Sequence, residues 1–202
     1  MYQFCVSGAA KGQSVEEAKD LARAVGVALA ERGHSLLTGA TTGLPNYAAE
    51  AYKAAGGQMS LGISPAASKI EHVMKYRLPT EAYDVILYSG LHYVGRDTLL
   101  INSSDAVVSV GGRLGTLHEF TIAMETNTPI GMLEDSGGIG REIHDILEAA
   151  GRRNDPELTF SKDPVALVEQ LEAIMDEQMH KYYVSRTRRN LARAAAKQEA
   201  AS

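Results

Sequence analysis

The chain has 202 residues, of which 45% are apolar, and a formal net charge of -5 at pH 7. This size and apolar content fit one well-packed α/β domain, and the negative charge argues against a general nucleic-acid binder. No stretch approaches the roughly 20 consecutive apolar residues that a membrane span needs. The lone Cys5 has no partner for an internal disulfide, and no basic leader precedes the first apolar stretch. We therefore expect a cytoplasmic protein without a membrane partner.

Short apolar runs alternate along the chain with stretches of helical periodicity. Ser14 and Glu17 match a capping box for the first helix, which Gly33 is placed to end, and Asp163 before Pro164 predicts the start of the last one. The polar, proline-punctuated stretch at 64–83 predicts a loop or lid. Strands are expected at 3–7, 35–38, 58–63, 84–88, 106–110, 129–133 and 158–161, and helices at 14–32, 47–55, 96–103, 117–124 and 164–175.

This alternation predicts a single doubly wound, Rossmann-like domain over residues 1–179, with a mainly parallel sheet and helices on both faces. Residues 180–202 differ, because they hold six Lys or Arg and one Glu. For this tail the composition allows a solvated helical or disordered segment, or docking on an acidic neighbouring subunit.

The stretch from Asp105 to Phe120 predicts a phosphate-binding turn. An apolar strand runs into Gly111, Gly112 and Gly115 before a helix begins, so backbone amides and the positive end of the helix dipole can approach an anion. Ligands of such sheets bind outside the carboxyl ends of the strands, where the βα turns converge. The turns that qualify are 7–12, 39–43, 88–96 and 111–116.

Other chemistry is poorly supported by the sequence. The first turn lacks the GxGxxG fingerprint of dinucleotide binding, and there is no GxxxxGK[ST] phosphate loop. The six histidines never fall at metal-ligand spacing with cysteines or carboxylates, so we expect no metal site.

Three segments, TGATTGLPN, LGISPA and VILYSGLHYVGRDTLLINSSDAVVSVGGRLGTLHEF, resemble the Lonely Guy (LOG) superfamily of Rossmann-like proteins, often named lysine decarboxylases. Within it the likeness is nearest to the bacterial branch related to molybdenum cofactor carriers. The resemblance covers about residues 3–175. The family pattern of an arginine, a GGxGT-type turn and a glutamate falls on these residues: Arg96, Gly111, Gly112, Gly115, Thr116 and Glu119.

The resemblance implies a nucleoside 5'-monophosphate phosphoribohydrolase, which cleaves the N-glycosidic bond to a free base and ribose 5-phosphate. It implies Glu119 and Arg96 as catalytic residues, with Glu119 stabilising charge at the anomeric carbon and Arg96 holding the base. An alternative for Glu119 is pure capping, since Thr116 and Glu119 also match a capping box; Arg96 could form an ordinary surface ion pair. The phosphate- or nucleotide-binding candidates are Ser7, Gly8, Gly39, Thr42, Gly43, Gly90, Gly111, Gly112, Arg113, Gly115 and Thr116.

The chain departs from the catalytic branch at several positions. The family's Met-His-x-Arg-Lys segment loses its histidine here and has Asp97 in place of the lysine, and Arg113 replaces the third glycine of the turn. These changes favour an alternative, a non-catalytic carrier or sensor of a phosphorylated ligand such as molybdenum cofactor or a nucleotide. No lysine sits in a setting for pyridoxal phosphate, so a lysine decarboxylase is not expected, and no cofactor is required. The family implies a homo-oligomer, with a dimer as the simplest case.

Overall fold

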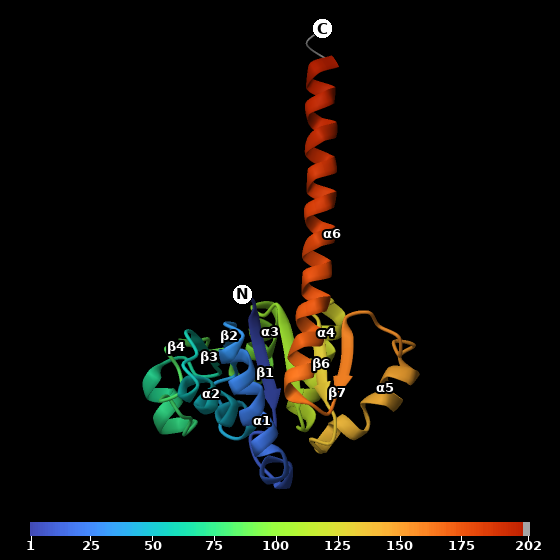
Figure 1. The fold of residues 1–202 in the computed structure, drawn as a ribbon. Helices are drawn as coiled ribbons and strands as arrows, with labels where there is room; N and C mark the ends of the chain where they lie inside the picture. Colours follow the sequence, from blue (N-terminus) through green and yellow to red (C-terminus); the bar gives the residue numbers. More distant parts are fainter. Residues whose placement is uncertain (200–202) are drawn as a thin grey trace.

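A computed structural model describes residues 1–199, with side chains described as far as Asn190. All seven strands are parallel and form one sheet in the order β4-β3-β2-β1-β5-β6-β7 (Figure 1). The strands are β1 (Gln3–Gly8), β2 (Ser35–Thr38), β3 (Ser60–Ser64), β4 (Val85–Tyr88), β5 (Ala106–Val110), β6 (Ile130–Leu133) and β7 (Leu158–Ser161). The helices are α1 (Gln13–Glu31), α2 (Leu44–Ala54), α3 (His92–Asn102), α4 (Leu114–Thr126), α5 (Ile143–Ala149) and α6 (Pro164–Glu199), with a π turn η1 (Glu71–Lys75) and a 3-10 turn η2 (Gly138–Arg141).

The strand order confirms the predicted α/β, Rossmann-like fold with one parallel sheet. From β1 the chain steps outward through β2, β3 and β4, then crosses back to β5 on the other side of β1. The order of the strands therefore reverses between β1 and β5, and a crevice opens above the carboxyl ends of these two strands, where doubly wound sheets bind ligands.

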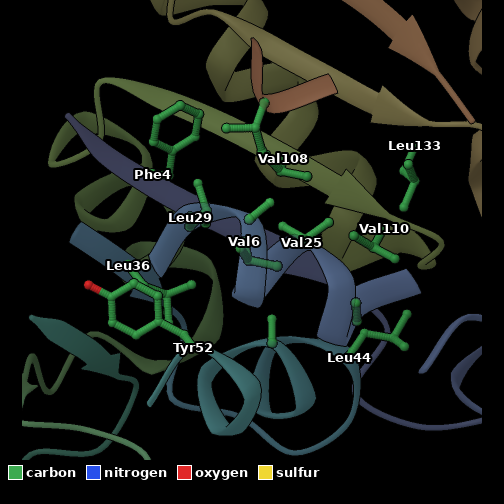
Figure 2. Close-up of a cluster of buried hydrophobic side chains, with 14 of the residues drawn as sticks. Phe4, Val6, Val25, Leu29, Leu36, Leu44, Tyr52, Val108, Val110 and Leu133 are labelled. Atoms are coloured by element: carbon green, nitrogen blue, oxygen red, sulfur yellow. The ribbon is translucent and has the colours of Figure 1, made fainter. Parts of the chain in front are cut away.

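Helices cover both faces of the sheet, as side-chain alternation along the strands requires. Phe4 and Val6 of β1 point to the face that α1, α2 and the first turns of α6 cover (Figure 2). Cys5, between them, points to the other face and packs against the α3, α4 and α5 side of the core. Burial raises the pKa of the Cys5 thiol, so this side chain acts as a small apolar core residue.

Several local predictions need correction. The Ser14 capping box is wrong: α1 starts at Gln13 behind Gly12, with no side-chain cap. Helix α3 starts at His92, four residues earlier than expected. Helix α5 was not predicted. The stretch 64–83 is not merely a loop, because it contains η1 and anchors the buried His72, whose ring bonds Ser64 Oγ at 2.8 Å.

The last helix joins the domain through its first turns. Asp163 Oδ1 accepts the amides of Val165 and Ala166 at 2.8 and 3.0 Å, which confirms the predicted cap. Leu171 and Met175 are buried against the sheet, while the rest of α6 extends beyond the amino ends of the strands (Figure 1). None of the described helices combines the length and apolar character that crossing a bilayer demands.

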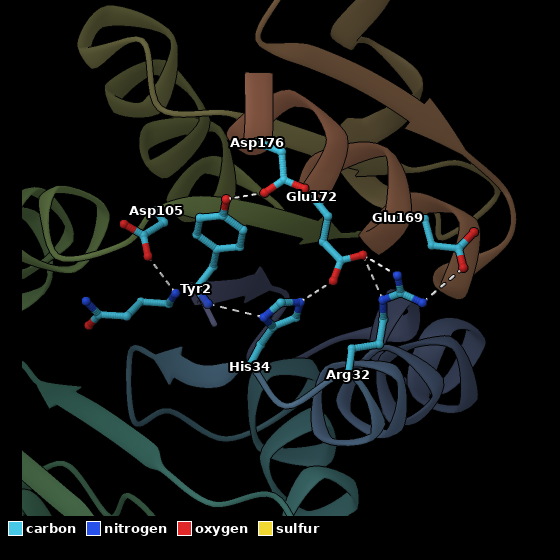
Figure 3. A network of polar contacts seen from close by, with 8 residues as sticks. Tyr2, Arg32, His34, Asp105, Glu169, Glu172 and Asp176 are labelled. Atoms are coloured by element: carbon cyan, nitrogen blue, oxygen red, sulfur yellow. Dashed lines mark hydrogen bonds and ion pairs between the residues drawn. The ribbon is translucent and has the colours of Figure 1, made fainter. Parts of the chain in front are cut away.

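A polar network ties α6 to the start of the chain (Figure 3). Glu172 accepts hydrogen bonds from Arg32, the residue that follows α1, and lies 2.5 Å from His34 Nε2. Tyr2 donates its hydroxyl to Asp176, and this hydrogen bond is the main reason that the pKa of Tyr2 rises to about 12. These contacts fix the angle at which α6 leaves the domain.

Candidate functional site

A pocket of about 220 Å³ opens above β1 and β5, at the point where the strand order reverses. The turns after β1 and β2, the first half of α3 and the first two turns of α4 form its wall. Eight of the residues predicted from the sequence line it: Ser7, Gly8, Gly39, Arg96, Arg113, Gly115, Thr116 and Glu119.

The other five predicted residues lie outside the lining of this pocket. Thr42 donates its hydroxyl to the Ala10 carbonyl at 3.1 Å, and Gly43 packs so tightly on Ala9 that a Cβ there would lie 2.3 Å from the Ala9 oxygen. Both residues shape the turn that carries the pocket wall. Gly90 lies against Ala67, while Gly111 and Gly112 form the buried inner side of the glycine turn at residues 111–116.

Arg96 reaches the pocket because Gly39 has no side chain. The guanidinium lies directly on the Gly39 backbone, where a Cβ would stand 1.5 Å from Nη1. Nη1 donates to the Ile63 carbonyl at 3.3 Å. Nε is buried and, among the described residues, has no hydrogen-bond partner, although Asp97 Oδ1 lies 3.2 Å away. A buried cation with unused donors is costly on its own and well suited to a ligand acceptor.

Glu119 faces Arg96 from α4 and is 8% exposed. Burial raises the pKa of this carboxyl to about 7; the Arg96 charge opposes that rise, and Asp97 adds to it. Ser7 of β1 donates its hydroxyl to Glu119. The capping interpretation of Glu119 is wrong, because α4 starts at Leu114 without a side-chain cap and the carboxyl binds Ser7 instead.

Asp97 is a site residue that the sequence analysis did not predict as one. Asp97 is 4% exposed and lies beside Arg96. Its Oδ2 is 2.8 Å from His118 Nδ1, within hydrogen-bonding distance. The sequence carried a signal, since Asp97 directly follows the predicted arginine and replaces the family lysine. The consequence is a buried cluster of one guanidinium and two carboxyl groups, with a partly exposed imidazole at its edge.

Contacts from the segment after β6 support the glycine turn at residues 111–116 on its inner side. Ser136 Oγ accepts the Gly111 amide at 2.7 Å, and the Ile139 amide donates to the Gly112 carbonyl at 2.9 Å. Gly112 has φ 105°, and a Cβ there would lie 2.1 Å from Thr116 Oγ1, so only glycine fits. The first amides of α4 have no acceptor inside the helix, and Gly115 is exposed at the pocket wall. This end of α4 can therefore hold an anion.

A second hollow of about 240 Å³ lies beyond the same turns, at the carboxyl ends of β6 and β7. Its wall includes Arg141, His144 and Phe160, and the His144 ring stacks on Phe160 with centroids 4.4 Å apart. No residue predicted for the site lies there. Among the side chains that the structure describes, no three from histidine, cysteine, aspartate or glutamate gather in a metal-binding arrangement.

Residues 1–168 match the SLOG cluster4 family. An uncharacterized protein from Archaeoglobus fulgidus is 31% identical over 134 residues, which are 66% of this chain and 81% of that protein.

Two solved structures resemble the chain over most of their length. The molybdenum cofactor carrier protein from Chlamydomonas reinhardtii superposes with a TM-score of 0.67 and 25% identity, covering 85% of this chain and 98% of that one. The molybdenum cofactor binding protein from Rippkaea orientalis superposes with a TM-score of 0.67 and 24% identity, covering 86% of this chain and 97% of that one. At this level of identity the likeness shows the fold.

Proposed function

The chain belongs to the SLOG cluster4 family, and we propose that it is a non-catalytic carrier or sensor of a small phosphorylated ligand, with molybdenum cofactor or a nucleotide as the ligand class. The observation that carries this proposal is the pocket in which the open first turn of α4 faces the Arg96 guanidinium. The likeness to the Chlamydomonas carrier protein supports the choice of ligand class.

The residues of the pocket fit an anion joined to a flat ring. The amides at the start of α4, with Arg113 beside them, suit the phosphate. The Nε of Arg96 forms an ion pair with Asp97 but makes no hydrogen bond among the described residues, so a ligand acceptor can bind it. The guanidinium lies 5.9 Å from the Tyr93 ring centroid, and a planar heterocycle can therefore be held by hydrogen bonds and stacking together. A protonated Glu119 adds a donor and removes a negative charge that would repel the ligand.

The same geometry favours binding over hydrolysis. Cleavage of a glycosidic bond needs an ionised carboxylate to stabilise positive charge at the anomeric carbon. Here burial raises the pKa of Glu119 to about 7, so about half of these carboxyls are protonated at pH 7. Ser7 also donates to one of its oxygens, and Asp97 lies beside the catalytic arginine candidate. These features reduce the negative charge of Glu119 and offset the positive charge of Arg96, which hydrolysis would use.

Phosphoribohydrolase activity remains the second candidate because one observation favours it. Arg96 and Glu119, the pair that the resemblance implies as catalytic, line the same pocket and are 3% and 8% exposed. A buried carboxyl with a raised pKa is also typical of catalytic sites.

One experiment separates the two candidates. The purified protein is titrated calorimetrically with nucleoside 5'-monophosphates and with molybdenum cofactor, while free base is measured chromatographically. We expect binding without base release, and at least ~10-fold weaker binding in Arg96→Ala and in Gly39→Ala, since a methyl at Gly39 displaces the guanidinium.

The matched control is Arg23→Ala, which removes an exposed arginine on α1. Its affinity should equal that of the unmodified protein. Base release that disappears in Glu119→Gln would establish the hydrolase instead. Absence of binding to every member of the panel would contradict both candidates.

A further inference from the structure

The second hollow, at the carboxyl ends of β6 and β7, lies outside the pocket to which the proposed function belongs. Its volume of about 240 Å³ is close to the 220 Å³ of the pocket above β1 and β5, and the two share no lining residue. Residues 132–141 form most of its wall, and α5 and β7 supply the rest, at the end of the sheet opposite β4 (Figure 1).

Backbone contacts hold the wall of the second hollow in place. The segment after β6 lines the hollow and also packs on the glycine turn at residues 111–116. Ser136 is 2% exposed, and its Oγ accepts the Gly111 amide at 2.7 Å. Gly138 lies so close to the turn that a Cβ there would stand 2.1 Å from the Gly112 oxygen. The second hollow is thus a preformed feature of the fold, as ligand pockets usually are.

One part of the second hollow is apolar. Met132 and Leu133 line it from β6 and are 4% and 2% exposed. His144 of α5 and Phe160 of β7 line it as well, and their rings stack with centroids 4.4 Å apart and planes 24° apart. An apolar group gains free energy when it leaves water for such a surface. This part therefore suits an uncharged hydrocarbon portion of a ligand.

Two side chains of opposite charge line the same hollow without neutralising each other. Within the described part of the chain, neither Arg141 nor Glu134 forms an ion pair, whereas Asp135 pairs with Lys162 at 2.8 Å. A ligand that is only anionic would be repelled by Glu134, and one that is only cationic would be repelled by Arg141. The arrangement therefore matches a small molecule that carries both a carboxylate and an ammonium group.

We propose that the second hollow binds a free α-amino acid with an apolar side chain. The planar Arg141 guanidinium can hold the α-carboxylate through two parallel hydrogen bonds. Glu134 can accept from the α-ammonium group, which has donors only. The apolar side chain then lies against Met132 and Phe160. Such a ligand differs in chemistry from a phosphorylated one, so this assignment goes beyond the proposed function.

Isothermal titration calorimetry of the full-length chain with L-leucine, L-methionine and L-phenylalanine tests the assignment. We expect at least one of them to bind. Its amide and its N-acetyl derivative, each of which lacks one of the two charges, should bind at least ~10-fold more weakly. Arg141→Gln and Glu134→Gln should each weaken binding of the amino acid itself by at least ~10-fold, because each removes one charged partner.

A variant that fills the second hollow provides a separate test. Gly140 lines it, and a Cβ there would meet nothing within 4 Å, so the larger side chain of Gly140→Leu can occupy the space without a clash at its base. This variant should lose binding. Arg153→Gln is the matched control, since Arg153 is an exposed arginine that pairs with Glu148 outside the hollow, and it should bind as the unmodified protein does. Circular dichroism checks that every variant is folded.

Absence of binding by all three amino acids would overturn the proposal. So would full affinity in folded Arg141→Gln and Glu134→Gln, or derivatives that bind as tightly as the amino acids. Loss of nucleoside 5'-monophosphate binding in Arg141→Gln would assign the second hollow to the phosphorylated ligand and overturn the proposal as well. The amino-acid titration needs no ligand in the pocket above β1 and β5, so it can fail while the proposed function stands, and the reverse.

Discussion

The Glu119 carboxyl has the most strongly perturbed pKa of the acidic groups that line the pocket. Its pKa in the folded protein is about 7, raised by burial above the ordinary value of 4.5. The folded protein therefore holds this proton more tightly than the unfolded chain does. The stability that comes from the protonated form is complete below pH 4.5 and is lost as pH rises toward 7.

Glu119→Gln should remove this dependence, because the amide cannot ionise. Between pH 5 and pH 8 the free energy of unfolding of the unmodified protein should fall by ~2–3 kcal/mol relative to the variant. Urea unfolding at both pH values measures the difference. Glu125→Gln, on the exposed side of the same helix, is the control and should follow the unmodified protein. Equal pH dependence of Glu119→Gln and the unmodified protein would contradict the raised pKa.

Some residues of the candidate site can be predicted from motif spacing in the sequence, whereas others depend on contacts between distant segments. Arg96, Thr116 and Glu119 could be predicted because they stand at motif spacing around one strand and turn. Ser136 could not, since its contact with the Gly111 amide spans 25 positions and depends on how the turn after β6 folds. Asp97 acquires its role only because α3 brings it against His118 of α4.

At the scale of elements, periodicity predicts the strands better than the ends of helices. Strand β5 has the predicted bounds because five successive buried residues end at a glycine turn. The start of α3 was misplaced because Tyr93 and Val94 are exposed and do not continue the buried stripe of Leu100 and Ile101. Helix α5 has only seven residues, too few for its period to stand out.

The joint between α6 and the domain depends on Glu172. Burial raises the pKa of this carboxyl, but hydrogen bonds from Arg32 and His34 outweigh that effect and hold it below the ordinary value (Figure 3). A lowered pKa means that the contribution to stability is present above the unfolded value of 4.5 and is lost as pH falls through the folded pKa.

Glu172→Gln should therefore destabilise the protein by ~1–2 kcal/mol at pH 7, because Arg32 and His34 lose a charged acceptor. The difference from the unmodified protein should shrink below pH 4. Urea unfolding measures both. Glu169→Gln is the control, since Glu169 also pairs with Arg32 but is 54% exposed, and surface pairs contribute less than ~1 kcal/mol. A Glu172→Gln effect that does not change with pH would exclude the ionic explanation.

For the whole molecule, alternation of strands and helices predicts a parallel sheet but not the order of its strands. That order follows from the crossover between β4 and β5, which brings the turn after β5 next to the turn after β1. Ser7 and Glu119, 112 positions apart, meet only as a result. The sequence therefore predicts which turns form the pocket, Ser7 and Gly39 included, but not which side chains meet across it.

The boundary proposed after residue 179 can be tested on the whole molecule. Residues 180–190 are exposed, whereas Leu171 is fully buried under the sheet. A chain ending at Met179 should therefore keep its melting temperature within ~2 °C, because it loses few buried contacts. Leu171→Ala in the full chain should lower it by ~5–15 °C, since truncating a buried leucine costs ~2–5 kcal/mol. Calorimetric melting compares the two. A shortened chain as unstable as Leu171→Ala would place the basic segment within the cooperative unit.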